Sequence, residues 1–304
     1  MTGVPDVDAA ITDGRTPPAD VEIDETLVRR LLAGQHPDLL ERSLRFAADG
    51  WDNATWRLGE DLAIRLPRRA EAAALADNEA RWLPVLASRV AVAVPEPVAT
   101  GRPTDDYPYP WSVVRWVDGV PTDVEPLRPE AAGELGAFLA DLHGPAPEAA
   151  PRNPHRGVPL RRKDEAVRAR LTHLRTGDVV DPAHLDRAEA VWAETVDVPI
   201  DAAPSWLHSD LHVKNVIGRD GHLAGVIDWG DLGVGDPATD LAAAWLHFPP
   251  EAHAEVWAAY GGPSDALVAR AKGWAVFFAL VCLDSVGDPG DGFTRMGRRV
   301  LAAL

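Results

Sequence analysis

The stretch WLHSDLHVKNVIGRDGHLAGVIDWGDLGVGDPATDLA, residues 206–242, is the most informative part of this chain. Two β-rich runs within it are joined by the turn sequence RDGH, which predicts a loop, a strand, a hairpin turn, a second strand and a second loop. Asp210 and Asn215 precede the first strand, and Asp228 ends the second. Because a hairpin brings its two ends together, we expect these three side chains to converge. Such a set is typical of a magnesium site beside a free carboxylate, as phosphate transfer requires.

The alternation of His208, Asp210 and His212 suggests a second chemistry, a zinc or iron site of the metal-hydrolase type. Such a site needs two or more further His or Asp ligands. His222 falls in the predicted hairpin turn, and the remaining histidines show no paired spacing. We therefore expect His208 to hold the loop by hydrogen bonds and His212 to be a loop residue. The phosphate-transfer interpretation is the stronger one.

The chain is strongly acidic, with 30 basic and 47 acidic residues and a formal net charge of −17. Its basic residues form only short clusters, such as LPRR and PLRRKDE. This composition argues against nucleic-acid partners and anionic membranes, because both would be repelled. It favours a cationic small-molecule partner, with the alternative that the acidity serves only solubility.

Cysteine content and apolar runs indicate a reducing, aqueous compartment. The one cysteine, Cys282, excludes a disulfide framework. The first 24 residues lack the basic and apolar regions of a secretory signal. The longest apolar run, residues 273–287, is too short to cross a bilayer and contains Asp284. We expect a cytoplasmic protein.

The order of predicted elements indicates an α+β, bilobal architecture. Residues 1–20 are expected to be a disordered segment, and Asp24 to cap the first helix. Three strands at 43–69 read as an antiparallel meander, followed by a helix at 70–90 and two strands. After Gly119 helices dominate. The predicted lobes are a nucleotide-binding lobe with its hinge at residues 21–117 and a catalytic and substrate-binding lobe at residues 118–304.

Several motifs in a fixed order resemble one family. HSDLHVKNVI (208–217), GVIDWGD (225–231) and GDPATDLA (235–242) resemble the aminoglycoside phosphotransferase family of antibiotic kinases, which shares the protein-kinase-like fold. GWDNATWRLGEDLAIRLPRR (50–69) resembles its nucleotide-positioning loop and cation-bearing strand. NEARWLPVL (78–86) resembles its glutamate helix and VVRWVDG (113–119) its hinge. The resemblance extends over about residues 25–300, and IRLPRR adds a feature of the macrolide-kinase branch.

The resemblance implies a role for each matching residue. Asp210 would be the catalytic carboxylate that orients the acceptor hydroxyl, and Asn215 and Asp228 would bind Mg²⁺ with the phosphates of ATP or GTP. Asp240 would brace the catalytic loop. The acceptor would be a hydroxyl of an aminoglycoside-type or macrolide-type antibiotic. The alternatives are a metabolic alcohol or sugar, or a nucleotide-binding regulator without transfer activity.

The nucleotide is expected to lie between the lobes. Arg65 stands where the family usually has lysine, and would pair with Glu79 and grip the phosphates, with Arg68 or Arg69 as alternatives. The remaining nucleotide candidates are two side chains beside Gly50 and two hinge residues acting through their backbone: Asn53, Thr55, Arg115 and Val117.

Two further features concern the acceptor and the departures from the family pattern. The acceptor pocket is expected between the catalytic loop and the helices after Gly230, with these candidate residues: Asp231, Trp245, Trp274 and Asp284. His247, Phe278, Asp288 and Asp291 are weaker candidates in the same region. The family usually has glycine where Ser209 stands, and Pro-Gly where Val213 and Lys214 stand. None of these departures removes a catalytic oxygen.

Overall fold

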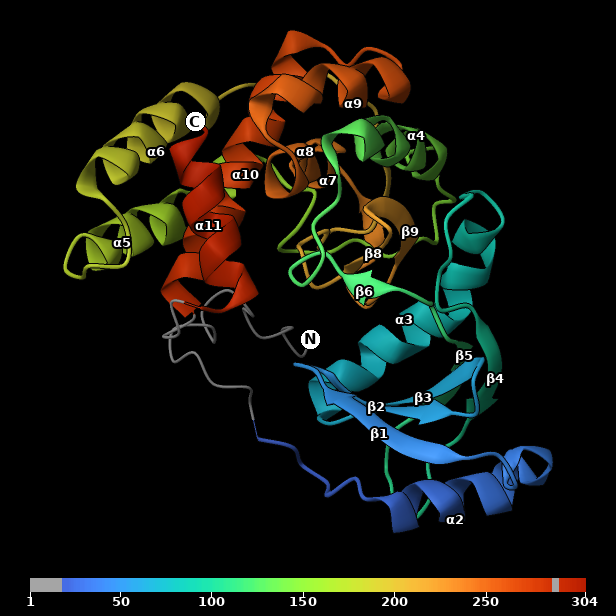
Figure 1. The fold of residues 1–304 in the computed structure, drawn as a ribbon. Coiled ribbons are helices and arrows are strands. Elements are labelled where there is room, and N and C mark those ends of the chain that lie inside the picture. Colours follow the sequence, from blue (N-terminus) through green and yellow to red (C-terminus); the bar gives the residue numbers. More distant parts are fainter. Residues whose placement is uncertain (1–17, 286–289) are drawn as a thin grey trace.

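The computed structural model describes residues 18–285 and 290–304 and consists of two lobes joined at residues 116–119 (Figure 1). The N-terminal lobe contains a five-stranded antiparallel sheet in the order β1-β2-β3-β5-β4. Its strands are β1 (Leu44–Asp49), β2 (Asn53–Leu58), β3 (Leu62–Pro67), β4 (Pro97–Gly101) and β5 (Trp111–Arg115). The predicted meander is confirmed, and β4, which begins at a proline, lies at the sheet edge.

Two helices lie on opposite sides of this sheet (Figure 1). The first, α2 (Glu25–Gln35), begins at Asp24, whose side chain accepts a hydrogen bond from the amide of Leu27 at 2.7 Å, as its sequence predicts. Its buried face packs on β2 and β3 in a separate hydrophobic core. The second, α3 (Ala70–Ala87), covers the other side and carries the buried Glu79.

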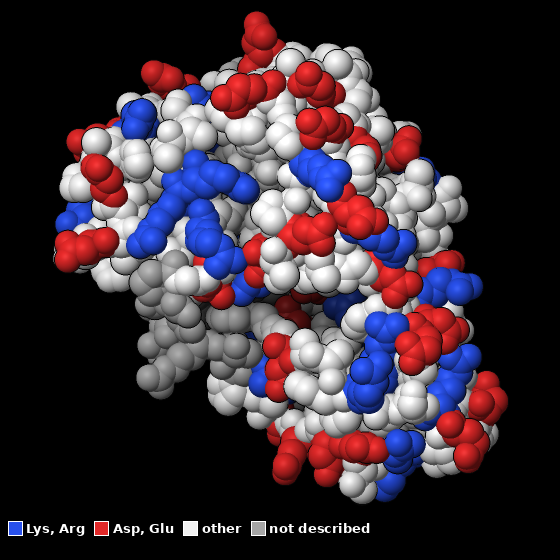
Figure 2. Space-filling view, viewed as in Figure 1, with Lys and Arg blue, Asp and Glu red and all other residues white. Residues whose placement is uncertain are grey.

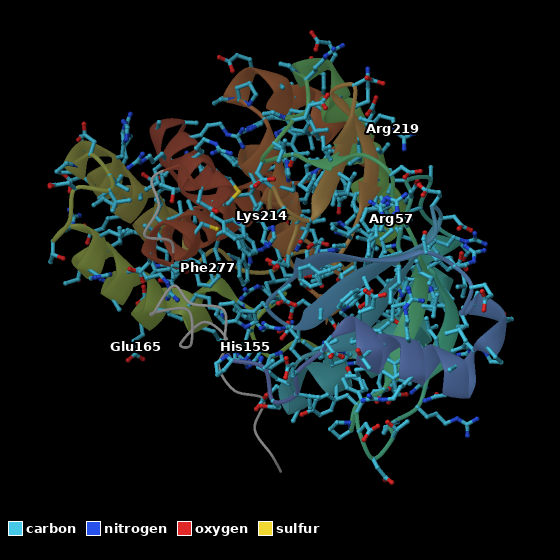
Figure 3. The ribbon with its side chains drawn as sticks, turned by 60° about the horizontal axis from the view of Figure 1, so that its bottom comes forward. Arg57, His155, Glu165, Lys214, Arg219 and Phe277 are labelled. Carbon is cyan, nitrogen blue, oxygen red and sulfur yellow. The ribbon has the colours of Figure 1, made fainter. Side chains whose placement is uncertain are left out.

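The connection between the lobes is fixed from both sides. Arg219, in the C-terminal lobe, donates a hydrogen bond to the carbonyl of Asp118 at 3.0 Å. Arg57, in the N-terminal lobe, approaches the carboxylate of Asp118 to 3.8 Å and stacks over the ring of Trp116. Figure 3 shows Arg57 and Arg219 on the same side of the molecule. Gly119 adopts φ 133° against the carbonyl of Gly218, where a side chain would collide.

The C-terminal lobe is mostly helical. Its helices are α4 (Ala132–Leu142), α5 (Asp164–Leu174), α6 (Pro182–Thr195), α7 (Ala238–Leu241), α8 (Ala243–His247), α9 (His253–Tyr260), α10 (Asp265–Ser285) and α11 (Gly292–Ala302). Five short strands accompany them: β6 (Val120–Pro121), β7 (Ser205–Leu207), β8 (Val216–Arg219), β9 (His222–Val226) and β10 (Gly233–Gly235). The predicted α+β bilobal fold is confirmed.

Helix α10 is the centre of this lobe and packs against α5, α6, α7, α8 and α11. By length and composition alone it is apolar enough to cross a membrane, but 78% of its most apolar window is buried inside the protein. That degree of burial is typical of a core helix, which must be apolar on nearly every face.

The predicted turn in the most informative stretch is present between β8 and β9. Asp220 and Gly221 adopt φ angles of 56° and 81° there. Two consecutive residues with positive φ form a type I′ turn, for which Asp-Gly is a favoured sequence. The local hairpin prediction is therefore confirmed. Residues 1–17, most of the predicted disordered segment, lie outside the described residues.

Candidate active site

The catalytic loop, residues 208–215 between β7 and β8, is held by one buried carboxylate. The two oxygens of Asp240 accept hydrogen bonds from the amides of His208 and Ser209, each at 2.7 Å. Asp240 is 1% exposed, so water cannot replace it. The bracing role expected for Asp240 is what the structure shows.

His208 is a structural residue of this loop. Its Nε2 lies 3.0 Å from the carbonyl of Ile227, and its Nδ1 accepts the amide hydrogen of Asp210 at 3.2 Å. The ring is fully buried against Trp229, and this burial lowers its pKa. With both nitrogens engaged, His208 has no lone pair to offer a metal ion, which argues against the zinc or iron interpretation.

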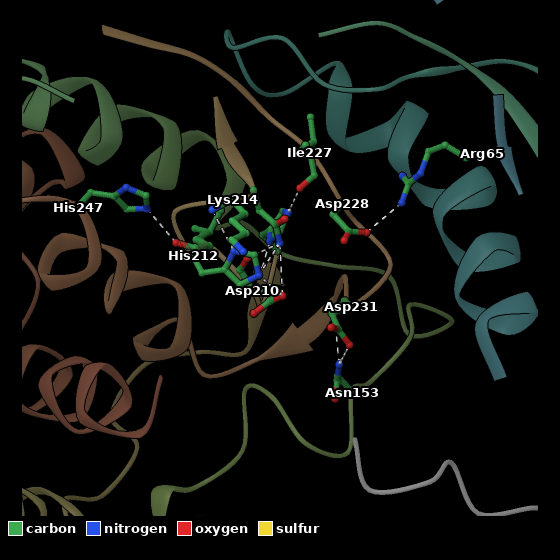
Figure 4. A network of polar contacts seen from close by, with 12 residues as sticks. Arg65, Asn153, Asp210, His212, Lys214, Ile227, Asp228, Asp231 and His247 are labelled. Atoms are coloured by element: carbon green, nitrogen blue, oxygen red, sulfur yellow. Dashed lines mark hydrogen bonds and ion pairs between the residues drawn. The ribbon is translucent and has the colours of Figure 1, made fainter. Parts of the chain in front are cut away.

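Asp210, Asn215 and Asp228 line one cavity, as the hairpin spacing implies. Asn215 donates from Nδ2 to the carbonyl of Asp210 at 3.0 Å and to its carboxylate at 3.3 Å. The amide of Ile227 donates to the carbonyl of Asn215 at 2.9 Å, which ties the start of the hairpin to its end. Figure 4 shows Asp210 and Asp228 on neighbouring segments.

The charge state of the base candidate follows from its neighbours. Burial opposes the ionisation of Asp210, but His212 and Arg156 more than compensate and hold its pKa below the usual range. Asp210 is therefore a carboxylate at neutral pH, able to accept a hydrogen bond from a hydroxyl. Asp228 is half exposed and adopts a positive φ of 61°, which turns its side chain into the cavity beside Arg65.

Arg65 is the N-terminal-lobe cation that contacts Asp228. It pairs with Glu79 of α3 through Nη1 and with Asp228 through Nη2 at 2.9 Å (Figure 4). Burial raises the pKa of Glu79 to about 7, and the pairing with Arg65 opposes that rise. Arg68 and Arg69 instead hold the β1–β2 loop, residues 50–52, through the carbonyl of Gly50 and the carboxylate of Asp52.

The other nucleotide candidates lie along the same sheet. Asn53 starts β2, and its carbonyl accepts the amide hydrogen of Gly50 at 2.8 Å, while Thr55 pairs with Arg65 across the strands. The N-terminal lobe contributes residues 49–52 to the cavity wall. At the hinge, the amide of Arg115 is already bonded to Glu96, so only its carbonyl is suited to a purine contact, and Val117 is buried.

Of the four main acceptor candidates, one lies at the cavity, and the structure corrects the prediction for the other three. Asp231 lines the cavity, where it accepts a hydrogen bond from Asn153 at 2.8 Å. Trp245 and Trp274 were expected to contact substrate, but both are packed in the core of the C-terminal lobe. Asp284 was expected there too, but its carboxylate is buried in pairs with Arg170 and His173. Trp274 illustrates the reason, because aromatic residues on a central helix meet other helices on most faces.

Two weaker candidates are at the cavity, Phe278 of α10 and Asp291 at the start of α11. Asp288 lies outside the described residues. The cavity has a volume of about 530 Å³, which is suited to a drug-sized ligand. Figure 2 shows acidic side chains on both lobes and a hollow between them.

Sequence reasoning missed the segment 151–157. Asn153 forms a tight turn by accepting the amide hydrogens of His155 and Arg156. Arg156 then reaches the cavity and stacks against the rings of Phe277 and Phe278. Burial raises the pKa of Asp231 to about 6, with Arg156 opposing the rise. The one sequence signal was a cluster of polar residues between prolines.

A two-lobed fold with a cation on β3, a buried glutamate on α3 and three oxygen-bearing side chains on the catalytic hairpin defines a kinase-like phosphotransferase. The sequence model of the phosphotransferase enzyme family (APH) matches residues 43–274. This chain belongs to that family.

Its relatives act on several antibiotics. The chain is 28% identical to the viomycin phosphotransferase of Streptomyces vinaceus over 206 residues, which are 61% of this chain and 67% of that one. A GDP complex of aminoglycoside 2′-phosphotransferase-IIIa superposes with a TM-score of 0.67 at 19% identity, covering 92% of this chain and 98% of that one. The macrolide 2′-phosphotransferase MphH of Brachybacterium faecium superposes with a TM-score of 0.60 at 24% identity, covering 85% of this chain and 89% of that one.

Proposed function

We propose that this protein transfers the γ-phosphate of ATP or GTP, bound with Mg²⁺, to a hydroxyl group of a small-molecule antibiotic. The observation that carries the proposal is the convergence of Asp210, Asn215 and Asp228 on one cavity beside Arg65. Family membership gives the phosphotransferase chemistry. The viomycin, aminoglycoside and macrolide phosphotransferases among its relatives support an antibiotic as the acceptor.

Asn215 and Asp228 fit a magnesium ion. Mg²⁺ takes oxygen ligands and is usually held by one or two protein groups together with substrate phosphates. Asn215 directs its Nδ2 to Asp210, so its Oδ1 is the atom left for a cation. Asp228 adds a carboxylate on the nucleotide side. When bound, the ion would neutralise charge that builds up on the phosphates during transfer.

The nucleotide would lie between β3 and the catalytic hairpin. Arg65, which pairs with Asp228 in the free protein, would release it to the metal and grip phosphate oxygens with the same planar fork. We assign Asn53 and Thr55 to the phosphate side, because both lie on β2 next to the loop that lines the cavity. The purine would contact the backbone at Arg115 and Val117.

Asp210 would act on the acceptor. Phosphoryl transfer depends on in-line positioning and charge stabilisation more than on covalent help from the enzyme. The ionised carboxylate would accept a hydrogen bond from the attacking hydroxyl, orient it toward the γ-phosphorus, and take its proton late in the reaction.

The cavity wall favours a cationic acceptor that also has an apolar part. Among the residues that the structure describes, these carboxylates line it: Asp49, Asp52, Asp210, Asp228, Asp231 and Asp291. Its side facing α10 and α11 is formed by Phe278, Val281, Cys282 and Phe293. The net charge of −17 adds long-range attraction for a cation.

A nucleotide-consumption screen tests the proposal. The purified protein is given MgATP or MgGTP with viomycin, kanamycin, a macrolide, choline and simple sugars, and products are identified by mass spectrometry. We expect a singly phosphorylated antibiotic and no product in EDTA. The variant Asp228→Ala should give no detectable turnover, because the metal loses its carboxylate.

Two results would contradict the proposal. Phosphorylation of choline or a sugar in preference to every antibiotic would show that the acceptor is a metabolic alcohol. Tight nucleotide binding with no product from any acceptor would favour a regulatory role.

A further inference from the structure

His212 lies in the catalytic loop two residues after Asp210, whose pKa it helps to lower, and it has no assigned part in the proposed transfer. Its ring is 16% exposed and lines the cavity. On one side its Nε2 is 3.3 Å from the Oδ2 atom of Asp210. On the other side its ring meets that of Phe293, the second residue of α11, edge to face at 4.7 Å. The imidazole therefore bridges the catalytic carboxylate and the C-terminal helix.

The hydrogen-bond partners fix which nitrogen of His212 carries the hydrogen. The amide of Lys214 points at Nδ1 at 3.3 Å, and an amide N–H can only donate, so Nδ1 is the acceptor. The ring hydrogen is then on Nε2. The Nδ2 group of Asn215 is also 3.3 Å from Nε2, but it is a donor and has its own acceptors on Asp210. The Nε2 hydrogen then lies beside the carboxylate of Asp210, with Nε2 and Oδ2 3.3 Å apart.

Two donors thus converge on one carboxylate oxygen. Asn215 Nδ2 and His212 Nε2 each lie 3.3 Å from Oδ2 of Asp210. A carboxylate that is held through one oxygen cannot rotate freely about its last bond. The second oxygen, Oδ1, remains for the acceptor hydroxyl.

The surroundings of His212 hold its backbone and its ring. Buried His247 binds the carbonyl of Leu211 at 2.9 Å, and Thr122 donates to the carbonyl of Val213 at 2.9 Å, so the carbonyl groups of both neighbouring residues are fixed. Lys214 lies 4.2 Å above the ring of Phe293 and pairs with Asp291 at 3.0 Å. Figure 3 shows Lys214 near the middle of the molecule.

We propose that His212 is a positioning residue for Asp210, which ties Oδ2 so that Oδ1 faces the acceptor hydroxyl. This role rests on the proposed function, because it presupposes that Asp210 receives a hydroxyl. His212 would act through Asp210 and would touch neither the nucleotide nor the metal.

Three single variants separate this role from a merely structural one. His212→Phe keeps an aromatic ring against Phe293 and removes both nitrogens. His212→Gln keeps a side-chain amide that can donate near the Nε2 position. Asp210→Asn removes the charge on which His212 is proposed to act.

The expected kinetic result, measured with MgATP and viomycin, is a change in kcat without a change in KM for the nucleotide. His212→Phe should lower kcat by about 10- to 100-fold, as expected for the loss of a hydrogen bond to a charged group. His212→Gln should recover most of that loss. In the Asp210→Asn background, His212→Phe should cause no further loss, because the residue it acts on is already disabled.

Three kinetic outcomes would overturn the proposal. One is a kcat of His212→Phe that stays within about twofold of wild type, because such a fall is much smaller than the expected one. Another is an equal loss in the Asp210→Asn background, which would show an independent role. The third is a raised KM for MgATP, which would place His212 on the nucleotide.

A second measurement uses wild-type protein and does not depend on turnover. In wild-type protein labelled with ¹⁵N-histidine, the nitrogen shifts and N–H couplings of His212 report its tautomer. A hydrogen on Nε2 and a bare Nδ1 are expected, and a hydrogen on Nδ1 alone would refute the geometry. If wild-type protein phosphorylates nothing in the screen, the proposed function fails, while this spectrum still decides whether His212 is bound to Asp210.

Discussion

The catalytic loop and the β1–β2 loop face the same cavity but are held by different interactions. In the catalytic loop a buried carboxylate, Asp240, binds backbone amides, and buried His247 binds a backbone carbonyl. In the β1–β2 loop two arginines that directly follow β3 hold the chain: Arg69 pairs with the carboxylate of Asp52 at 2.8 Å, and Arg68 donates to the carbonyl of Gly50 at 3.0 Å.

This difference separates a fixed half of the site from an exchangeable half. A buried carboxylate that satisfies two backbone amides has no competitor, because removing it leaves those amides unpaired in the interior. An arginine paired with a carboxylate at a cavity can instead bind phosphate oxygens in the same bidentate geometry. Under the proposed function, the loop that would orient the acceptor hydroxyl is held by buried groups, and the side that would receive the nucleotide has cations whose partners a phosphate can replace.

The largest expected effect is on the fixed half. Asp210→Asn keeps the shape of the side chain and removes the charge that orients the acceptor hydroxyl, so kcat should fall by about 10²–10⁴-fold. Nucleotide affinity, measured by calorimetry with MgADP, should stay close to wild type. A large loss of nucleotide affinity in this variant would mean that the two halves are not separate.

The exchangeable half is tested by Arg65. Arg65→Ala should weaken MgATP binding by about 10- to 100-fold, because charge-assisted hydrogen bonds to phosphate are lost. Arg65→Lys should restore only part of that affinity, since one ammonium cannot reach Glu79 and phosphate with the geometry of a planar fork. Arg42→Ala, which breaks an exposed pair with Asp61 on the same lobe, is the matched control. Equal affinity in Arg65→Ala and wild type would refute the phosphate role.

Acid should lower the stability of the folded protein through His247, which holds the catalytic loop. Burial lowers its pKa to about 3, whereas an unfolded histidine titrates near 6.5. The unfolded chain therefore takes up a proton that the folded chain refuses, so stability is full above pH 6.5 and is lost as pH falls toward 3. At pH 5 the loss from this residue is about 2 kcal/mol.

The variant His247→Gln isolates this contribution from those of His208 and His253, whose pKa values burial also lowers. Urea unfolding at pH 7.5 and pH 5 should show the wild-type advantage over the variant shrinking at the lower pH. An advantage that is the same at both values would show that folding does not lower the pKa of His247.

The smallest expected effect concerns Ser209, which adopts φ 78° although it is not glycine. It is 1% exposed, and its hydroxyl has no hydrogen-bond partner within the part of the chain that the structure describes. Ser209→Gly relieves both costs and keeps the amide that Asp240 binds, so the unfolding free energy should rise by about 1 kcal/mol.

Asp220→Gly is the matched control for Ser209→Gly, because Asp220 also has positive φ but is exposed in a turn where aspartate is well tolerated. Denaturant unfolding should show a smaller gain there. A loss of stability in Ser209→Gly would mean that the serine contributes something that glycine cannot.

Ser209 and Arg65 both differ from the residue that is usual in the family, and the structure shows the consequence of each difference. The sequence shows that serine replaces glycine, and the structure adds that this position requires a left-handed backbone. In the same way Arg65 stands where lysine is usual, and the structure adds that its two nitrogens divide between Glu79 and Asp228.

Short-range patterns in the sequence determined the strand meander, the cap at Asp24 and the hairpin that gathers Asp210, Asn215 and Asp228. These features depend on residues a few positions apart, where backbone preference and periodicity act directly. Tertiary structure alone decided that Asn153 reaches Asp231 and that Phe278 borders the cavity, whereas Trp274, one turn earlier on α10 in the same core, is fully buried. Periodicity shows which side chains share a helix face, but what that face meets depends on how the whole chain buries its apolar surface.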